Sequence, residues 1–455
     1  MSNIKNIINN FIFEIKSQKF LFFCCISWIF LWLSINTFPT AYLDRINVFE
    51  NLKIFTNFLR ISIPLLGTNL ILLIYWITHT TKNNVILTLF FFYFFFLAVP
   101  ILIYDYNGAF IERVFLLLLS FNAILILKIF LTKCKNSDLK ILLYISLFFL
   151  CSVLIIYIPI YYEYFLKEKI MWLYFNNLWE NTYFDNSMIR VTGTARIFLI
   201  LAIFFLCVLN LMKKKIKKLC IIGVILFCGI NIWLLQSRTI IFIYIVVLVF
   251  NQIFLSKSSN AKKIIFLILM LILPILTVKI IQKAKQITID KVDSYNGSAV
   301  PGVDGSKSRI ILGENFSSGR TLVWSEILKF YNPKNFFGYG SQADRYETNL
   351  IKEYGSNASN AYLYAFLCGG YLGLLFLLLI NIILIYYIYV YIKNKLYQKN
   401  NIELNTSVLI LTSLLMRGIL ENCYAVFSID FLLFIICLII LQKNIKRFII
   451  YKFLH

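Results

Sequence analysis

The sequence predicts an all-α, polytopic integral membrane protein with about 12 transmembrane helices and one long loop outside the bilayer. Of its 455 residues, 60% are hydrophobic and only 14% are charged, whereas about a quarter of the residues in a soluble globular domain carry a charge. Apolar stretches of about 18 to 20 residues recur along the chain, and each is long enough to cross roughly 30 Å of hydrocarbon. These stretches do not alternate in polarity as the strands of a transmembrane barrel would, so we expect helical spans.

The expected spans follow from these apolar stretches. They lie at approximately 20–37, 61–79, 85–104, 114–131, 141–160, 194–212, 219–236, 239–255, 264–281, 360–391, 404–422 and 424–441. The tenth stretch is too long for one crossing, because about 33 helical residues would extend about 50 Å. Its outer part contains Gly369, Gly370 and Gly373, so we expect this helix to begin above the membrane or to bend there.

The placement of lysine predicts the topology. Alternate loops carry the lysines: Lys5, Lys16 and Lys19, then Lys82, Lys133 to Lys140, Lys213 to Lys218, Lys257 to Lys263, Lys393 to Lys399, and Lys443 to Lys452. Loops rich in lysine lie in the cytoplasm, so both termini are expected there and the long loop is expected outside. The chain then divides into the first nine helices (1–281), an external loop with short helices (282–359), and the last three helices with a cytoplasmic tail (360–455).

The composition also excludes several classes of protein. The net charge of +23 arises mostly from the short loops between spans, which leaves no basic face for a nucleic acid. The chain has two histidines, and nearly all of its ten cysteines lie in apolar stretches. We therefore expect no nucleic-acid partner, no metal site and no other cofactor.

Arginine is distributed differently from lysine. Of the eleven arginines, only Arg447 lies in a segment assigned to the cytoplasm. The others lie in external loops or near the external ends of spans: Arg45, Arg60, Arg113, Arg190, Arg196, Arg238, Arg309, Arg320, Arg345 and Arg417. Because a guanidinium can hold a phosphate at two points and tolerates partial desolvation, this distribution favours an anionic phosphate ligand at the outer membrane surface. The alternative is that these arginines anchor helix ends at lipid headgroups.

Arg320 lies in the long polar segment, follows Gly319 and precedes Trp324 by four residues. If a helix begins near Ser318, the guanidinium and the indole ring share one face, and the helix N-terminus adds a favourable field for an anion. This pattern predicts an anion-binding site. The alternative is a capped loop helix that a cation–π contact stabilises.

Three further arginines lie where spans meet the outer boundary. Arg238 follows Ser237 between two successive spans, and a guanidinium at that place is expected to point into a wet cavity or toward a partner. Arg190 and Arg196 flank Gly193 at the mouth of the sixth span. This pair favours a ligand-lined helix mouth over headgroup anchoring alone.

Arg417 is the clearest charged residue inside a span, because its neighbours in the sequence are apolar. Glu421 follows one helical turn later and lies on the same face. Two interpretations stay open at this point. The two residues form an internal ion pair that fixes helix packing, or they take part in substrate binding and acid–base chemistry.

Together these residues resemble the O-antigen ligase/O-antigen polymerase superfamily, mainly over residues 186–391 and weakly over the last two spans. The resemblance is carried by Arg190-Val-Thr-Gly193, Ser237-Arg238, Ser318-Gly-Arg320 with Trp324, Phe337-Gly-Tyr-Gly340, and Asn360-Ala-Tyr-Leu363 with Gly370 and Gly373. Each motif is short, but their order and spacing around one long external loop make the set informative.

The resemblance implies a fold like that of the C-type membrane glycosyltransferases, in a multi-pass protein of the bacterial inner membrane with a periplasmic loop. It also implies a donor glycan carried on undecaprenyl pyrophosphate, and a chain-length regulator as a further partner. Arg238 and Arg320 would then hold the pyrophosphate, assisted by Arg190 or Arg196. The candidates for accepting the proton of the attacking sugar hydroxyl are Glu421, Asp344 and Glu314. The remaining candidate substrate-binding residues are Arg417, Ser359, Asn360, Tyr362 and Trp324.

One departure from the family pattern separates its two branches. In the ligases the residue before the Asn-x-Tyr-Leu motif is a histidine. This chain has Ser359 at that position, and no external histidine is expected that could replace it. We therefore expect a metal-independent, inverting polymerase that joins lipid-linked repeat units. Three alternatives stay open: an O-antigen ligase that transfers glycan to lipid A core, a flippase of lipid-linked oligosaccharides that performs no chemistry, and a non-catalytic membrane scaffold.

Overall fold

The computed structural model describes residues 85–103, 128, 135–162, 191–234, 237–255, 260–261, 263–270, 272, 276, 320–332, 335–346, 358, 360–396, 401–424 and 429–454. Within these ranges the regular secondary structure is helical, without strands. Three of the helices are long and apolar enough to cross a membrane, namely Lys215–Trp233, Ala361–Lys393 and Ile402–Leu420. The prediction of an all-α membrane protein is confirmed for these parts of the chain, while the count of about 12 spans stays a prediction.

Most of the expected spans in the described ranges coincide with helices. These are α6 (Val85–Ile103), α8 (Asn136–Tyr162), α10 (Val191–Leu209), α11 (Lys215–Leu234), α12 (Arg238–Phe250) with the π-helix η3 (Asn251–Leu255), α17 (Ala361–Lys393), α18 (Ile402–Leu420) and α19 (Ile429–Leu454). Two shorter helices, α14 (Arg320–Phe330) and α15 (Ala343–Tyr346), fall in the predicted external loop. The predicted spans 20–37 and 61–79 lie outside the described residues, and 114–131 and 264–281 lie partly outside them.

The described helices belong to two compact units. One unit holds α6, α8 up to Ser146, α14, α15, α17, α18 and α19, and the other holds α8 from Leu147, α10, α11, α12 and η3. The division of the chain at 281 and 359 stays a prediction.

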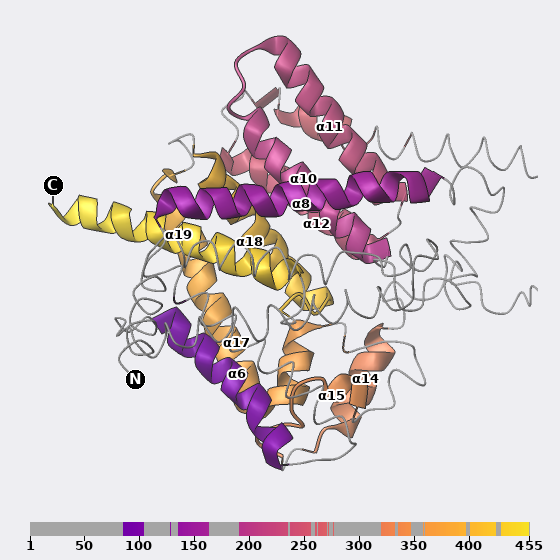
Figure 1. Cartoon of the computed structure of the whole chain (residues 1–455), viewed down its shortest axis with the longest axis vertical. Coiled ribbons are helices and arrows are strands. Elements are labelled where there is room, and N and C mark those ends of the chain that lie inside the picture. Colours follow the sequence, from indigo (N-terminus) through magenta and orange to yellow (C-terminus); the bar gives the residue numbers. More distant parts are fainter. Residues whose placement is uncertain are drawn as a thin grey trace, which may run out of the picture. The chain divides into compact units, whose positions relative to one another are not determined.

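In the unit that contains α10, the short links 210–214 and 235–237 join three helices that pack together (Figure 1). Short links between packed helices make successive helices antiparallel, so α10 and α12 begin at the same end of this unit. At the opposite end, the Asn210 side-chain amide donates a hydrogen bond to the Asn251 amide oxygen at 2.9 Å.

In the other unit, α6 packs along α17, and α18 packs against α19 (Figure 1). Phe431 of α19 makes edge-on ring contacts with Phe90 and Phe94 of α6 at centroid distances of 6.1 and 5.7 Å. Phe91 and Phe95, which lie about 100° around α6 from Phe90 and Phe94, are exposed. A helix that is apolar on every face is typical of a membrane span that touches protein on one side and lipid on the other.

Helix α17 is not one continuous rod, because it reverses direction at Gly370. Gly370 has φ 62° and ψ −156°, a backbone conformation that is essentially restricted to glycine. The Asn381 amide donates a hydrogen bond to the Tyr362 hydroxyl at 3.1 Å, although residues 19 apart would lie about 28 Å apart in a straight helix. A Cβ atom on Gly373 would lie 2.9 Å from the Ala365 carbonyl oxygen. Residues 361–369, which we name the re-entrant arm, therefore fold back along the remainder of α17.

The reversal is closed by the loop 336–340 of the predicted external segment. The amides of Tyr339 and Gly340 donate to the carbonyl oxygens of Leu367 and Cys368 at 3.0 and 2.8 Å. The Tyr371 amide donates in turn to the Phe336 carbonyl at 3.3 Å. These bonds satisfy backbone groups that the broken helix leaves without helical partners. The predicted bend is confirmed, and the backbone turns further than the sequence analysis expected.

Two motif glycines face each other at this contact. A Cβ atom on Gly338 would lie 2.5 Å from the Gly370 nitrogen, and a Cβ atom on Gly370 would lie 2.0 Å from the Phe336 carbonyl oxygen. Two backbone segments can approach this closely only where neither carries a side chain. One close contact between two backbone segments therefore requires both Gly338 of the Phe-Gly-Tyr-Gly motif and Gly370 of α17.

Candidate functional site

Asn360 lies at the tip of the re-entrant arm and bonds to two helix ends. Its side-chain oxygen accepts hydrogen bonds from the amides of Tyr362 and Leu363 at 2.8 and 3.0 Å, which caps the start of α17. Its side-chain nitrogen donates to the Ile419 carbonyl at 2.7 Å, and Ile419 lies in the last turn of α18. One buried side chain thus joins the beginning of the arm to the end of α18.

Ala358 is held from two sides. The Trp324 indole of α14 donates to the Ala358 carbonyl at 3.1 Å, and the Ala358 amide donates to a carboxylate oxygen of Asp344 at 3.1 Å. The indole N–H of Trp324 thus bonds to the backbone. The predicted contact of Trp324 with a substrate stays a prediction. Ser359, the residue that departs from the ligase pattern, lies outside the described residues, but both of its chain neighbours are fixed.

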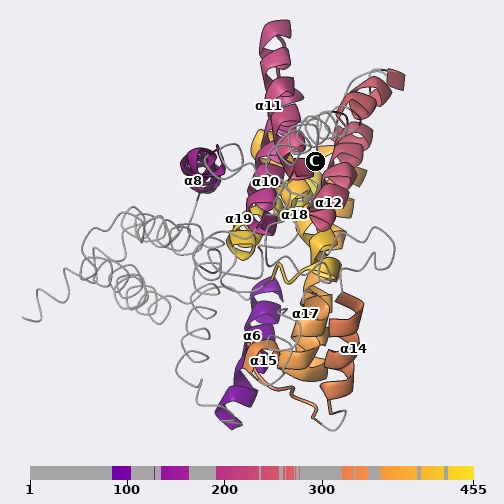
Figure 2. The same cartoon turned by 90° about the vertical axis from the view of Figure 1, so that its right-hand side faces the viewer.

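Helix α14 lies beside α17 (Figure 2), and aromatic side chains that follow its C-terminal end pack on the arm. The Tyr331 ring packs on Phe366 with centroids 4.0 Å apart and the planes tilted by 33°, and it meets Tyr371 edge-on at 6.0 Å. Its hydroxyl donates to the Asn335 carbonyl. Burial, together with the neighbouring phenols of Tyr371 and Tyr339, raises the pKa of Tyr331 above its ordinary value, so this hydroxyl stays a hydrogen-bond donor at neutral pH.

Arg417 forms the centre of a buried ion cluster. Its guanidinium donates two hydrogen bonds to one Glu421 oxygen at 3.1 and 2.9 Å. It donates two more to the two Asp430 oxygens at 2.7 and 3.0 Å. Arg417 and Asp430 are each 2% exposed and Glu421 is 7% exposed. We call these three residues the Arg417 cluster.

The Arg417 cluster continues into a wider set of buried polar groups. The Tyr424 hydroxyl donates to the Asn381 side-chain oxygen at 2.9 Å, and the Asn381 amide reaches Tyr362 on the arm. Along α18, Arg417 lies about 21 Å from Glu403, which pairs with Lys140 at the lysine-rich end of the helix. This polar set therefore lies toward the other end of the span, on the side where the sequence predicts the outer surface.

The arginines predicted to bind an anion occupy helix starts. Arg320 is the first residue of α14 and Arg238 is the first residue of α12. Arg196 lies in the second turn of α10, so Arg196 and Arg238 are near the same end of their unit. Arg190 precedes α10 and lies outside the described residues, as does Glu314.

Sequence reasoning missed Asp430, Asn381 and Tyr424. Asp430 lies in the first turn of an apolar helix, 13 residues after Arg417, and a carboxylate in an apolar span predicts a buried cationic partner. That signal was present in the sequence. The involvement of Asn381 and Tyr424 depends on the reversal of α17, which local sequence patterns do not encode.

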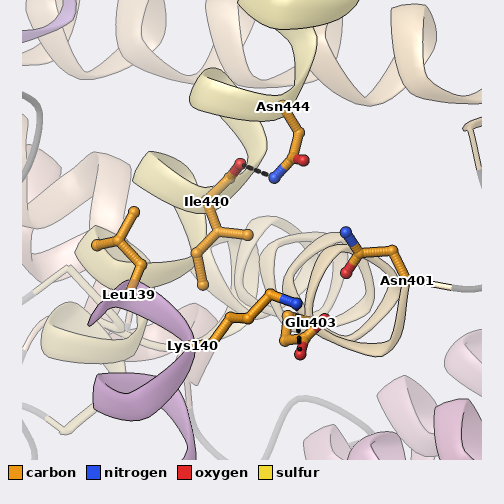
Figure 3. A pocket seen from close by; sticks show the side chains of 6 residues that line it. All are labelled: Leu139, Lys140, Asn401, Glu403, Ile440 and Asn444. Carbon is orange, nitrogen blue, oxygen red and sulfur yellow. Dashed lines mark hydrogen bonds and ion pairs between the residues drawn. The ribbon is translucent and has the colours of Figure 1, made fainter. Parts of the chain in front are cut away.

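A small hollow at the lysine-rich end of α18 does not resemble a substrate site. It is lined by Leu139, Lys140, Asn401, Glu403, Ile440 and Asn444 (Figure 3). Its volume of about 10 Å³ suits about one water molecule. Lys140 pairs with Glu403 at 3.1 Å, and the Tyr144 hydroxyl donates to the same carboxylate at 2.9 Å. Among the described residues, no group of three or more His, Cys, Asp or Glu side chains could hold a metal ion.

Comparison with known proteins gives one family. The O-antigen ligase family model matches residues 221–378. No curated protein and no solved structure matches the chain. The matched range includes Arg238, Arg320, Trp324, the loop 336–340 and the whole re-entrant arm. It begins later than the predicted range 186–391, so Arg190 and Arg196 lie outside it. This match supports the predicted O-antigen ligase/polymerase superfamily and does not distinguish its two branches.

Proposed function

We propose that this protein is a membrane glycosyltransferase that polymerises lipid-linked oligosaccharide repeat units into a surface polysaccharide. The donor is a glycan on undecaprenyl pyrophosphate, and the acceptor is a second lipid-linked repeat unit. In this proposal the protein lies in the bacterial inner membrane, with both termini in the cytoplasm and the loop 282–359 in the periplasm. A chain-length regulator is proposed as a further partner.

The observation that carries this proposal is the family match over residues 221–378, because it spans both Arg238 and Arg320. Each of these arginines is the first residue of a helix. A helix N-terminus and a guanidinium both favour an anion, and a diphosphate offers oxygens for bidentate pairing. A phosphate-bearing donor fits this residue set better than a neutral sugar would.

The reaction proposed here needs charge stabilisation more than acid catalysis. An acceptor sugar hydroxyl forms a new bond to C1 of the donor sugar, and the bond between C1 and the pyrophosphate oxygen breaks with inversion. The electron pair leaves with undecaprenyl pyrophosphate, and the hydroxyl proton passes to a base. Guanidinium groups held against the pyrophosphate would stabilise the charge that develops on the leaving group.

Two of the three candidate bases, Glu421 and Asp344, can be compared by the hydrogen bonds that they accept. Glu421 accepts two hydrogen bonds from Arg417, and Asp344 accepts one from the Ala358 amide. The contacts of Arg417 favour the ion-pair interpretation, since four of its N–H groups bond to protein carboxylates. We therefore propose that Arg417 and Glu421 position the helices and do not take part in proton transfer. Asp344, which bonds to the amide of Ala358 next to Ser359 in the chain, is then the favoured candidate base.

Ser359 supports the polymerase branch over the ligase branch, because a serine hydroxyl at neutral pH is a weaker base than a histidine imidazole. An O-antigen ligase with lipid A core as acceptor is the second candidate function, and the family description itself favours it. A flippase is the candidate outside enzyme chemistry.

Deletion of the gene in cells that make the polymer separates these functions. For a polymerase, we expect single repeat units attached to the lipid core, and wild-type expression should restore long chains. Naked core together with long chains on carrier lipid would indicate a ligase and would overturn the proposal. Repeat units that accumulate on the cytoplasmic leaflet would indicate a flippase.

A further inference from the structure

The start of the re-entrant arm is packed against the end of α18. Ala361 is 0% exposed, and a Cβ atom on Gly418 would lie 3.8 Å from the Ala361 Cβ atom. Gly418 and Ile419 are in the last turn of α18, and Ile419 accepts the hydrogen bond from Asn360. The position of the arm therefore depends on where α18 ends and how that end is oriented.

The Arg417 cluster determines the orientation of that end. Glu421 is the C-terminal cap of α18, and its amide donates to the Arg417 carbonyl at 2.7 Å. Asp430 is the second residue of α19, so its two bonds to Arg417 tie the end of α18 to the start of α19. These contacts close the turn between the two helices through buried side chains.

Electrostatic attraction also favours the contact between the re-entrant arm and the end of α18. When both carboxylates are ionised, the Arg417 cluster carries a formal charge of −1 and is nearly inaccessible to water. The N-terminus of the re-entrant arm carries a partial positive charge, and the arm begins beside this cluster. The attraction between them is stronger in a low-dielectric surrounding than at a protein surface.

We propose that Asp430 and Glu421, acting through Arg417, are positioning residues that lock the re-entrant arm. The lock holds the Asn360–Tyr362 segment in the geometry that glycan transfer requires, and this part rests on the proposed function. In this account Arg417 does not bind the donor pyrophosphate, because its N–H groups already bond to Asp430 and Glu421.

Labelling at position 361 tests the lock without any activity assay. The parent protein is an Ala361→Cys variant with Cys423→Ser, since the Cys423 sulfur lies 3.6 Å from the Gly418 Cβ position. Reaction of the thiol introduced at position 361 with a small maleimide is followed by peptide mass spectrometry. Asp430→Ala removes both bonds to Arg417 and should speed labelling by at least about tenfold, and Asp430→Asn, which keeps one acceptor, should give an intermediate rate.

Glycan transfer tests the positioning role. Asp430→Ala is expected to lower the transfer rate by about 100-fold, because a displacement of about 1 Å has that effect on a reacting geometry. The matched control is Glu403→Ala, which removes another ion-paired carboxylate, from the helix that carries Arg417. Because Glu403 lies about 21 Å along α18 from Arg417, this control should leave labelling and transfer within about twofold of the parent.

A cross-link provides the rescue. The 3.8 Å separation of the Ala361 and Gly418 Cβ positions equals the mean for disulfides, so Ala361→Cys/Gly418→Cys should form one after the Tyr424 ring shifts slightly. When Asp430→Ala is added to this cysteine pair, oxidation to the disulfide should restore the rate of glycan transfer. The restored rate should lie within about threefold of the rate of the oxidised cysteine pair with Asp430 intact.

Three outcomes would overturn the proposal. Unchanged labelling in Asp430→Ala would show that the arm needs no lock. Faster labelling with unchanged transfer would remove the positioning role and leave the proposed function intact. Faster labelling with no rescue by the cross-link would place Asp430 in the reaction itself. If the parent transfers no glycan at all, the proposed function fails, and the labelling result still decides whether the lock exists.

Discussion

Replacing Arg320 with lysine is expected to lower the rate of polymer elongation by about 10²- to 10³-fold. The substitution keeps the positive charge at the start of α14 but removes the planar fork that, in our proposal, bonds to two phosphate oxygens at once. Because the lost interaction strengthens as charge develops on the leaving group, the effect should appear mainly in kcat. The measurement is the initial rate of elongation in membranes that contain equal amounts of each protein.

Arg447→Lys is the matched control for this prediction. It makes the same chemical change in α19, in a segment that the sequence assigns to the cytoplasm, and it should leave elongation within about twofold of wild type. Elongation that stayed at the wild-type rate in Arg320→Lys would refute the pyrophosphate-binding role of Arg320.

Replacing Gly370 with alanine is expected to destabilise the folded protein by roughly 2–6 kcal/mol. Gly370 has φ 62° and ψ −156°, so any side chain strains the backbone there. The added Cβ atom would also lie 2.0 Å from the Phe336 carbonyl oxygen, so the loop 336–340 would have to leave α17. We expect a lower melting temperature in detergent and faster hydrogen exchange at the amides of Tyr339 and Gly340.

Gly223→Ala in α11 is the matched control. A Cβ atom on Gly223 would meet nothing within 4 Å, and alanine in a helix interior is more stable than glycine by roughly 0.5–1 kcal/mol. The control should therefore keep or slightly raise the melting temperature. A Gly370→Ala protein with wild-type stability and exchange would contradict the described reversal of α17.

The helices could be predicted from the sequence because length and hydropathy are local properties. Apolar stretches near 18–20 residues located α10, α11, α12 and α18 to within a few residues. The end of one helix and the start of the next were less predictable. The last span was expected from 424, whereas α19 begins at Ile429, because Glu421 to Tyr424 form a turn that the Arg417 cluster stabilises.

The reversal of α17 could be predicted only as a bend. Gly369, Gly370 and Gly373 indicated a weak point in the helix, but the direction of the chain after it depends on backbone bonds from the loop 336–340, which is distant in the sequence. The same long-range contacts explain why Asn360 and Tyr362 were recognised only as motif residues. Their partners Ile419 and Asn381 become neighbours through the tertiary fold.

The candidate site, too, could be predicted only in part, because some of its contacts join residues of different helices. The pairing of Arg417 with Glu421 follows from helical periodicity, since the two residues are four apart. Asp430 is not in the same helix, so its contribution depended on how α18 and α19 pack. With a second carboxylate present, the balance between the two interpretations of Arg417 moves toward an internal ion cluster.

Reconstitution of the purified protein in liposomes tests the central claim most directly. The liposomes contain many copies of a single substrate, one repeat unit linked to undecaprenyl pyrophosphate, and no lipid A core. Both the glycan length and the amount of free carrier lipid are measured over time. We predict longer glycans on carrier lipid, with one molecule of undecaprenyl pyrophosphate released for each repeat unit added. Glycans that stay one unit long until lipid A core is supplied, or that never lengthen, would contradict the account.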